Sequence, residues 1–582
     1  MNLPVFKLWK KRETYDLARN QQFIDVFGGY NHNLRIQDNE FYDEQNMSAC
    51  EYPILRTRQA RTAGSTITSP GGLLAKDAMA VVSGSNIVYN NYTIDLGLTS
   101  GVKQLISMGA YLVIWPDKKY LNTQDLSDYG SLEASTTTST TVSVTLCRQD
   151  GTSYGTYTIS TTAPDDPDNG DMWMDTSNAD VPVLKEWSES ASMWVTIPTT
   201  YVKIAATGIG TGFEQYDGVE LNGFTGDLGE LNGSHVLYTV DTDYIVTVGV
   251  IDAASYTEEG AVTVTRTIPA MDYVCECGNR LWGCKYGVVN GKAVNELYAS
   301  KLGDPKNWNC YMGLSTDSWT ASRGSDGVFT GAISFQDHPL FFKENCIEKV
   351  YPSSTGAHQV VTVDCRGVQK GSWRSLVIVD EVLYYKSIKD VCAYTGSLPQ
   401  GVSGALGDVS YSDARAGAVD GVLYICMKDS SNAYRLFTYD TEKRIWHAED
   451  ATKAMMFAEM DGKLYFIDET TGKMMTCNTG KTGDIDWQIE SGVIGLSMAE
   501  NKYISRYVIR LETAGGVHLY CKYDNGEWLD KGTTTPGNNL DTIVIPVMPQ
   551  RHDHMQFRLT GNKACRIYSI AKYVQQGSDV NL

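Results

Sequence analysis

The same short apolar strand recurs along the chain, as Val382-Leu383-Tyr384-Tyr385, Val422-Leu423-Tyr424-Ile425 and Lys463-Leu464-Tyr465-Phe466. With the leucine as a marker, and with Pro339-Leu340-Phe341-Phe342 as an earlier copy, successive leucines are 43, 40 and 41 residues apart. A strand-rich repeat of about 40 residues is typical of the blades of a β-propeller, each built from four antiparallel strands. Unrelated β-hairpins are the alternative, but three nearly equal intervals in a row favour blades.

Two more copies of the marker strand lie towards the N-terminus, at Tyr111-Leu112-Val113-Ile114-Trp115 and Arg280-Leu281-Trp282. One marker for each blade predicts about six blades. An early strand at Ile87-Val88-Tyr89 is a candidate for one more.

The gap between Leu112 and Leu281 is 169 residues, about 130 more than one blade of this period requires. The excess predicts an insertion, which begins near a Ser/Thr-rich run at 135–141 and ends near 265–269. Insertions of this kind usually leave a scaffold from one exposed loop.

The last hundred or so residues break the period and show alternating strands, such as Tyr507-Val508-Ile509-Arg510-Leu511 and His518-Leu519-Tyr520-Cys521-Lys522-Tyr523. This pattern predicts a separate β-sandwich. We therefore expect an all-β protein, a β-propeller with an inserted β-region and a C-terminal sandwich. The expected parts are an N-terminal arm with the first propeller strands (1–130), inserted small β-domains (131–269), the remaining blades (270–480) and the sandwich (481–582).

The chain is acidic, with 69 Asp and Glu against 49 Lys and Arg and a formal charge of −20. This balance argues against a protein that binds nucleic acid through its phosphates, because such binding requires clustered Lys and Arg. It is compatible with a protein that lets nucleic acid pass, since an acidic wall repels phosphate. Simple solubility is the other explanation, and the favoured one.

The 13 cysteines are mostly spread singly. The N-terminal residues include Lys7, Lys10, Lys11 and Arg12 but no apolar stretch after them, so we expect no signal peptide. No apolar run is long enough to span a bilayer. The chain is therefore expected to be made in a reducing cytoplasm with free, mostly buried thiols.

Catalytic motifs are sparse. Gly480-Lys481-Thr482 ends like a phosphate-binding loop, but Met475 stands where the first glycine should be, so a turn is favoured. Cys275, Cys277 and Cys284 lie close together but are better explained as core thiols than as metal ligands. His552-Asp553-His554 could bind a metal, although a solvated loop is favoured. We expect no enzyme activity, no catalytic residues, no cofactor and no metal.

Three tryptophans lie at short intervals in the first part of the insertion: Trp173, Trp187 and Trp194. They could form a platform for a sugar, because an aromatic face stacks on the apolar face of a pyranose. They could equally be the core of a small module, which is the favoured reading. They are the candidate glycan or partner contacts of the chain.

Several short segments of the sequence resemble those of a known family. They are Asn279-Arg280-Leu281-Trp282-Gly283, the stretch from Asn295 to Trp308, Asp326-Gly327-Val328-Phe329-Thr330-Gly331, Phe27-Gly28-Gly29-Tyr30-Asn31, and Gln556-Phe557-Arg558-Leu559 followed by Gly577-Ser578-Asp579. These segments, and their order along the chain, are similar to those of the packaged-DNA stabilisation and tail nozzle proteins of tailed bacteriophages. The similarity covers about residues 27–579, and the insertion is its weakest part.

This resemblance implies a structural virion protein of the phage tail, assembled in the cytoplasm of the host bacterium. Such proteins form a hexameric ring of identical copies below the portal and adaptor, with other tail proteins as neighbours. The ring continues the DNA channel, retains the genome and lets it pass at ejection without sequence-specific binding. The insertion could decorate the outside or contact tail fibres or the host surface. The alternatives are a tail protein that binds a host-surface glycan and a propeller glycosidase.

Overall fold

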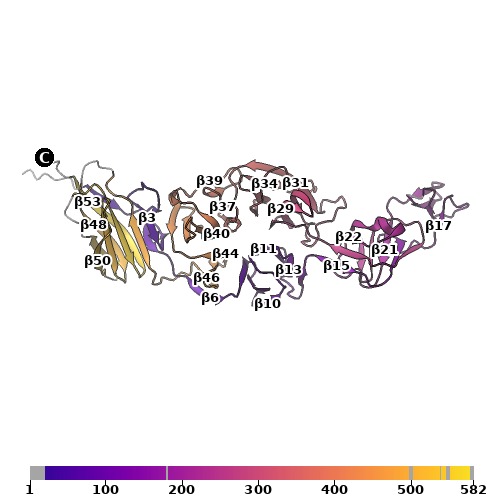
Figure 1. Cartoon of the computed structure of the whole chain (residues 1–582), viewed down its shortest axis with the longest axis horizontal. Helices are drawn as coiled ribbons and strands as arrows, with labels where there is room; N and C mark the ends of the chain where they lie inside the picture. The colour runs from indigo at the N-terminus through magenta and orange to yellow at the C-terminus, as the bar shows by residue number, and fades with distance from the viewer. Residues whose placement is uncertain (1–19, 179–180, 497–501, 538, 546–550, 577–582) are drawn as a thin grey trace, which may run out of the picture. The chain divides into compact units, whose positions relative to one another are not determined.

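The computed structural model describes residues 20–178, 181–496, 502–537, 539–545 and 551–576 (Figure 1). The described chain is almost entirely β-structure, with three short 3-10 helices, η1 (Gly226–Leu231), η2 (Trp373–Ser375) and η3 (Gly404–Leu406). None of these helices has the length and apolar character needed to cross a membrane. The predicted all-β class is confirmed. Residues 7–12 and 577–579, which were used above, lie outside the described residues.

The chain divides into two compact units, one from Met1–Ile94 with Cys365–Leu582 and one from Asp95–Asp364. The first unit holds four of the four-stranded sheets that have the blade pattern. Their strands are β7 (Pro70–Ala75), β8 (Met79–Ser83), β9 (Asn86–Tyr89) and β10 (Tyr92–Asp95); β36 (Val377–Val379), β37 (Val382–Lys386), β38 (Val391–Tyr394) and β39 (Gln400–Gly401); β40 (Ser412–Val419), β41 (Val422–Lys428), β42 (Tyr434–Asp440) and β43 (Ile445–Ala448); and β44 (Ala454–Met460), β45 (Lys463–Asp468), β46 (Lys473–Thr476) and β6 (Thr62–Thr66).

The second unit holds three more such sheets. Their strands are β11 (Gln104–Met108), β12 (Tyr111–Trp115), β13 (Lys119–Asn122) and β14 (Tyr129–Ser131); β28 (Tyr273–Glu276), β29 (Leu281–Val289), β30 (Lys292–Ala299) and β31 (Trp319–Ser322); and β32 (Gly331–Phe335), β33 (His338–Phe342), β34 (Cys346–Tyr351) and β35 (Gln359–Asp364).

The six marker leucines of the repeat all occupy the second strand of their sheets. Each is at most 1% exposed, so the marker is the residue that each blade buries at its centre. The leucines are Leu112, Leu281, Leu340, Leu383, Leu423 and Leu464. The predicted propeller is confirmed, but the described residues form seven blade sheets instead of six. The seventh consists of β7–β10 and contains Ile87-Val88-Tyr89 in β9, whereas its second strand, β8, has no leucine.

One blade is completed by a strand from the other end of the chain. Strand β6 pairs with β46 in an antiparallel ladder, in which Ala63 lies opposite Met475 and Thr62 lies opposite Thr476. The first three strands of this sheet come from Ala454–Thr476. The pairing of β6 with β46 therefore joins residues that are about four hundred positions apart in the sequence.

The sandwich has two six-stranded sheets, with strand orders β4-β5-β53-β48-β51 (β1 also pairs with β53) and β2-β3-β47-β52-β49-β50. Its N-terminal strands are β1 (Asn20–Ile24), β2 (Gly29–Tyr30), β3 (Glu40–Gln45), β4 (Met47–Glu51) and β5 (Ile54–Thr57). Its C-terminal strands are β47 (Trp487–Ser491), β48 (Lys502–Thr513), β49 (Val517–Tyr523), β50 (Leu529–Thr534), β51 (Asp541–Ile545), β52 (Met555–Gly561) and β53 (Cys565–Gln576).

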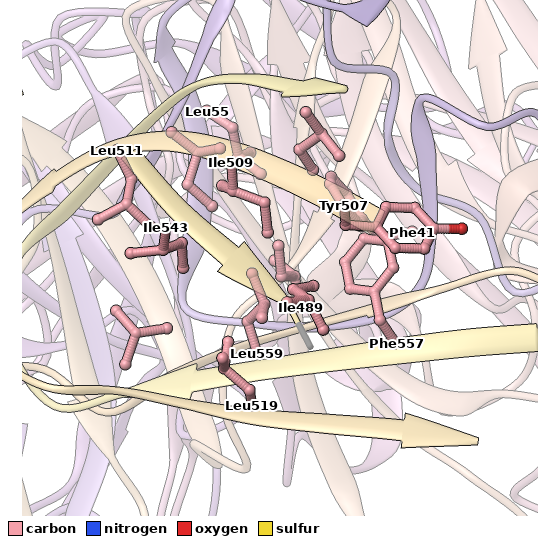
Figure 2. Packing of buried hydrophobic residues seen from close by; sticks show 14 of the residues in the cluster. Phe41, Leu55, Ile489, Tyr507, Ile509, Leu511, Leu519, Ile543, Phe557 and Leu559 are labelled. Atoms are coloured by element: carbon pink, nitrogen blue, oxygen red, sulfur yellow. The ribbon is translucent and has the colours of Figure 1, made fainter. Parts of the chain in front are cut away.

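The sandwich core mixes residues from both ends of the chain. Figure 2 shows Phe41 and Leu55 packed with Tyr507, Ile509 and Phe557, and all five are buried. The sequence placed the sandwich in residues 481–582 alone and assigned residues 1–130 to an arm and propeller strands. The structure corrects this, because β1–β5 are sandwich strands. Short strands without a local partner are stable only in a sheet that leaves an edge open to them.

The insertion in the second unit forms three sheets around one shared core. The first contains β15 (Ala134–Thr137), β27 (Thr263–Arg266), β22 (Gly218–Asn222) and β23 (Gly233–Val236). The second contains β24 (Thr239–Asp241), β25 (Tyr244–Val248), β21 (Tyr201–Ala205), β16 (Val142–Cys147) and β26 (Ser255–Glu258). The third contains β17 (Thr158–Ser160), β18 (Met172–Asp175), β19 (Val183–Ser188) and β20 (Met193–Thr196).

Candidate functional site

The structure brings the three tryptophans of the insertion together on one face of the sheet β17–β20. Trp173 alternates with Met172 and Met174 in β18, so its side chain points to the opposite face from theirs. Met174 and its cross-strand partner Leu184 belong to the shared core of the insertion. Trp187 and Trp194 are direct cross-strand partners in β19 and β20. We call the three tryptophans the aromatic face.

The rings of the aromatic face meet edge to face. The ring of Trp194 lies 5.4 Å from that of Trp173 and 5.5 Å from that of Trp187, with interplanar angles of 65° and 63°. Trp173 is buried at 6% exposure, whereas Trp187 and Trp194 are half-buried. The Trp173 indole nitrogen donates to the backbone oxygen of Ser160 at 3.1 Å. Trp173 therefore supports the cluster, while the other two rings keep accessible surface.

A charged pair borders the aromatic face. The Lys185 ammonium lies 4.7 Å above the Trp173 ring and donates a 2.7 Å hydrogen bond to Asp175. The hydrogen bond from Lys185 lowers the pKa of Asp175 to about 2. The site thus offers exposed aromatic surface next to polar groups, the combination that stacks on a sugar ring and hydrogen-bonds its hydroxyl groups.

The cysteine group considered as a metal site is part of a blade core. Cys275, Cys277 and Cys284 are free and buried. They pack with Trp282 and Phe341. Burial raises the pKa of Cys275 and of Cys284 well above the ordinary value, which disfavours the thiolate that a metal would need. Among the described residues, no group of three His, Cys, Asp or Glu side chains is arranged to hold a metal ion.

The motif His552-Asp553-His554 is less exposed than a solvated loop would be. The His552 ring is buried and stacks on Tyr523 at 4.1 Å between centroids. The Nδ1 atom of His554 lies 3.0 Å from Asp553. Both imidazoles also lie near the carboxylate of Asp524, with Nδ1–oxygen distances of 3.5 Å for His552 and 3.9 Å for His554. Gly480-Lys481-Thr482 lies in an irregular segment after β46, next to residues 59 and 60. The Gly480 amide donates to the side-chain oxygen of Gln59 at 2.7 Å.

A second site, which sequence reasoning missed, is a cavity of about 250 Å³ in the first unit. We call it the charged cavity. It lies among residues of β4, the segment after β5, and the blades β40–β43 and β44–β46. Cys50, Asp420 and Lys443 are exposed at its mouth, whereas His447, Glu449 and Cys477 are buried in its floor.

The floor of the charged cavity contains a network of buried ion pairs. Arg61 pairs with Glu449 and, at 3.0 Å, with Asp450, while Arg58 lies 3.1 Å from Asp450. Burial alone would lower the pKa of Arg61, but the carboxylates of Glu449 and Asp450 outweigh it and raise the pKa. Burial raises the pKa of the Cys477 thiol to about 12, so this thiol is protonated. The carboxylate of Asp450 is thus shared by the two guanidinium groups.

His447 and Glu44 form a second buried pair beside this network. The Nδ1 atom of His447 lies 2.8 Å from a Glu44 carboxylate oxygen. The Nε2 atom of His447 and the Nε atom of Arg61 are buried and have no hydrogen-bond partner among the described residues. The only sequence signal for this site was the charged run His447-Ala448-Glu449-Asp450 at the end of an otherwise apolar blade strand. Its partners Arg58 and Arg61 lie far away in the sequence.

No protein-family model matches the chain, and no curated protein matches it. Among solved structures, the matches include an exo-β-1,3-galactanase from Phanerochaete chrysosporium with galactose, at 8% identity and a TM-score of 0.20, over 52% of this chain and 95% of that one. A mutant of a family 29 carbohydrate-binding module matches at 9% identity and a TM-score of 0.10, over 20% and 80%. An engineered GH43 glycoside hydrolase matches at 9% identity and a TM-score of 0.20, over 52% and 97%. Similarity at this level is not evidence of a shared activity.

Proposed function

We propose that this chain is a structural protein of a bacteriophage tail, whose propeller and sandwich form the scaffold, and that its inserted domain binds a glycan through the aromatic face. In the tail, copies of the chain form a ring below the portal and adaptor. The ring surrounds the channel through which the genome passes.

The scaffold role is supported mainly by the pairing of N-terminal strands with C-terminal strands in the first unit. Strand β6 completes a blade whose other strands lie about four hundred residues away, and β1–β5 complete both sheets of the sandwich. Separating these parts requires whole hydrogen-bonded ladders to break together. A ring around packaged DNA would benefit from this resistance to unfolding.

The nozzle position within the tail rests on the resemblance of the sequence and on its charge. A formal charge of −20 is compatible with a channel wall that does not bind phosphate and so lets DNA slide past. Loss of the chain tests the position: particles assembled in cells without a functional copy of this gene are expected to package DNA and then lose it. Particles that keep their DNA and infect normally would contradict the nozzle role.

The glycan-binding role is supported by the half-buried rings of Trp187 and Trp194, which lie on the face turned away from the core. The full-length protein on a glycan array tests it, with Trp194→Ala as the matched variant. We expect binding to one class of host-surface glycan, lost in the variant. No binding by the unchanged protein would remove this role. Incubation of the bound glycan with the protein distinguishes binding from cleavage, and we expect no product.

A further inference from the structure

An exposed carboxylate lies next to the aromatic face. The amide of Trp187 donates to the backbone oxygen of Asp171 at 2.8 Å, which places Asp171 opposite Trp187 across the β18–β19 pair. Asp171 directly precedes Met172, so by the alternation of a strand its position falls on the face of Trp173. Directly opposite residues on antiparallel strands have Cβ atoms about 4.5–5.5 Å apart. The Asp171 carboxylate is therefore a neighbour of the Trp187 ring.

The protein already holds a cation against a ring and a carboxylate at Trp173. The Lys185 ammonium lies 4.7 Å from the centre of that ring and 2.7 Å from the Asp175 carboxylate. An ammonium in this position is attracted both by the ring and by the opposite charge.

Trp187 and Asp171 repeat the ring and the carboxylate without the ammonium. The carboxylate of Asp171 accepts a hydrogen bond from the amide of Asp168 at 2.9 Å. Among the described residues, no Lys, Arg or His forms an ion pair with Asp171, which is exposed. The half-buried ring of Trp187 and this carboxylate are therefore both open to a cation from outside the protein.

The sheet that carries the aromatic face is strongly acidic. Residues 158–196, which include its four strands, contain eight Asp and Glu and one Lys, so this stretch carries −7 of the −20 of the chain. The one cation, Lys185, is already held by Asp175. Because like charges repel, this surface disfavours glycans with carboxylate, sulfate or phosphate groups and favours those with protonated amines.

We propose that the aromatic face selects glycans whose sugars carry free amino groups, and that a ligand ammonium contacts the Trp187 ring and the Asp171 carboxylate. Trp194 offers its half-buried ring to the apolar side of a sugar. This inference rests on the glycan-binding role proposed above, and it names the class of glycan and a specificity-determining residue, Asp171.

Two oligosaccharides that differ only in their amino groups test the proposal. They are the pentamer of β-1,4-linked glucosamine and the pentamer of β-1,4-linked N-acetylglucosamine. Titration calorimetry with the full-length protein, at a pH at which the amines are protonated, gives both affinities. We expect the glucosamine pentamer to bind about tenfold more tightly, and this advantage to shrink in salt, because salt screens the charges. Equal affinities, or tighter binding of the acetylated pentamer, would overturn the proposal.

Asp171→Asn assigns the selectivity to one residue. The amide oxygen of asparagine can still accept the hydrogen bond from Asp168, so the local backbone is kept while the charge is lost. We expect the affinity for the glucosamine pentamer to fall about fivefold and that for the acetylated pentamer to stay the same. The control is Glu230→Gln, which removes an exposed charge from η1, in the same insertion but outside this sheet, and should change neither. An equal loss for both pentamers in Asp171→Asn would contradict the role of its charge.

The same measurements separate selectivity from glycan binding itself. Trp194→Ala is expected to weaken both pentamers, because both use the aromatic surface. If array glycans bind through Trp194 but the glucosamine pentamer has no advantage, the selection of amino sugars is wrong and the glycan-binding role stands. If no glycan on the array binds, both are wrong.

Discussion

The Nδ1 atom of His447 lies 2.8 Å from a carboxylate oxygen of Glu44, and both side chains are buried. His447 is in β43, the last strand of a blade, and Glu44 is in β3, a strand of the sandwich. The pair therefore joins the propeller strands and the sandwich of the first unit at a point that water does not reach. Arg435 adds a second link nearby, since its guanidinium donates to Asp43 at 2.7 Å and to the backbone oxygen of Glu44 at 2.5 Å.

Removing one member of the Glu44–His447 pair should destabilise the first unit. Glu44→Ala leaves His447 without its partner and opens a hole, and losses of about 3–5 kcal/mol are typical when one half of a buried pair is removed. Urea unfolding, followed by hydrogen exchange in β3 and β43, measures the change. The matched control is Glu40→Ala, in the same strand but half-buried. Equal effects of the two substitutions would contradict the account.

The same pair should make stability depend on pH. Burial raises the pKa of Glu44 above its ordinary 4.5, although His447 acts in the opposite direction. A carboxyl group with a raised pKa in the folded state contributes stability below its unfolded pKa and loses that contribution as pH rises through the folded value. The advantage of the native protein over Glu44→Gln should therefore shrink as pH rises from 4.5. Unfolding free energies of both proteins across this range measure it, and an advantage that grows with pH would contradict the prediction.

The packing of neighbouring blades should not tolerate a side chain at Gly417. A Cβ atom on this residue of β40 would lie 2.3 Å from the Cβ atom of Phe457 in β44. We expect Gly417→Ala to destabilise the first unit by about 1–3 kcal/mol, the usual cost of overpacking. Gly404→Ala is the control, because nothing lies within 4 Å of the added atom and its backbone is not left-handed. Thermal unfolding of the two variants distinguishes them, and equal midpoints would count against the inter-blade contact.

Two tryptophans of the aromatic face should respond differently to truncation. Trp173 is buried and contacts Trp194 edge to face, so Trp173→Ala should destabilise the inserted domain by about 3 kcal/mol or more. Trp194→Ala removes a half-buried ring, and its larger effect should fall on glycan binding. Hydrogen exchange in β18 and β19, together with the array measurement, separates the two effects. A stable Trp173→Ala variant that lost only binding would reverse these assignments.

The part of the fold that the sequence predicts is the part that repeats. Six blades bury a marker leucine in their second strand, and the last four of these leucines recur at a regular spacing. The alternating strands of the C-terminal segment predict a sandwich. The leucine marker does not identify the seventh blade, because its second strand, β8, is Met-Ala-Val-Val-Ser. This strand buries Ala80, Val81 and Val82 and has no leucine.

The long-range pairings could not be predicted in the same way. All residues of Thr62–Thr66 are exposed and show no apolar pattern, and only the open edge of β46 makes this segment a strand. The charged cavity has the same origin, because Arg58 and Arg61 look like ordinary surface residues until Glu449 and Asp450 are placed beside them. The three tryptophans could be grouped from their spacing, but not assigned to one face or to edge-to-face contacts.

The location of the chain in a virus particle tests the central claim most directly. Electron microscopy of intact particles, with an antibody raised against this chain, gives that location. We expect the label in a ring around the channel at the distal part of a short tail. Label confined to peripheral fibres would leave only the glycan-binding role, and particles without any label would contradict the assignment to a phage tail.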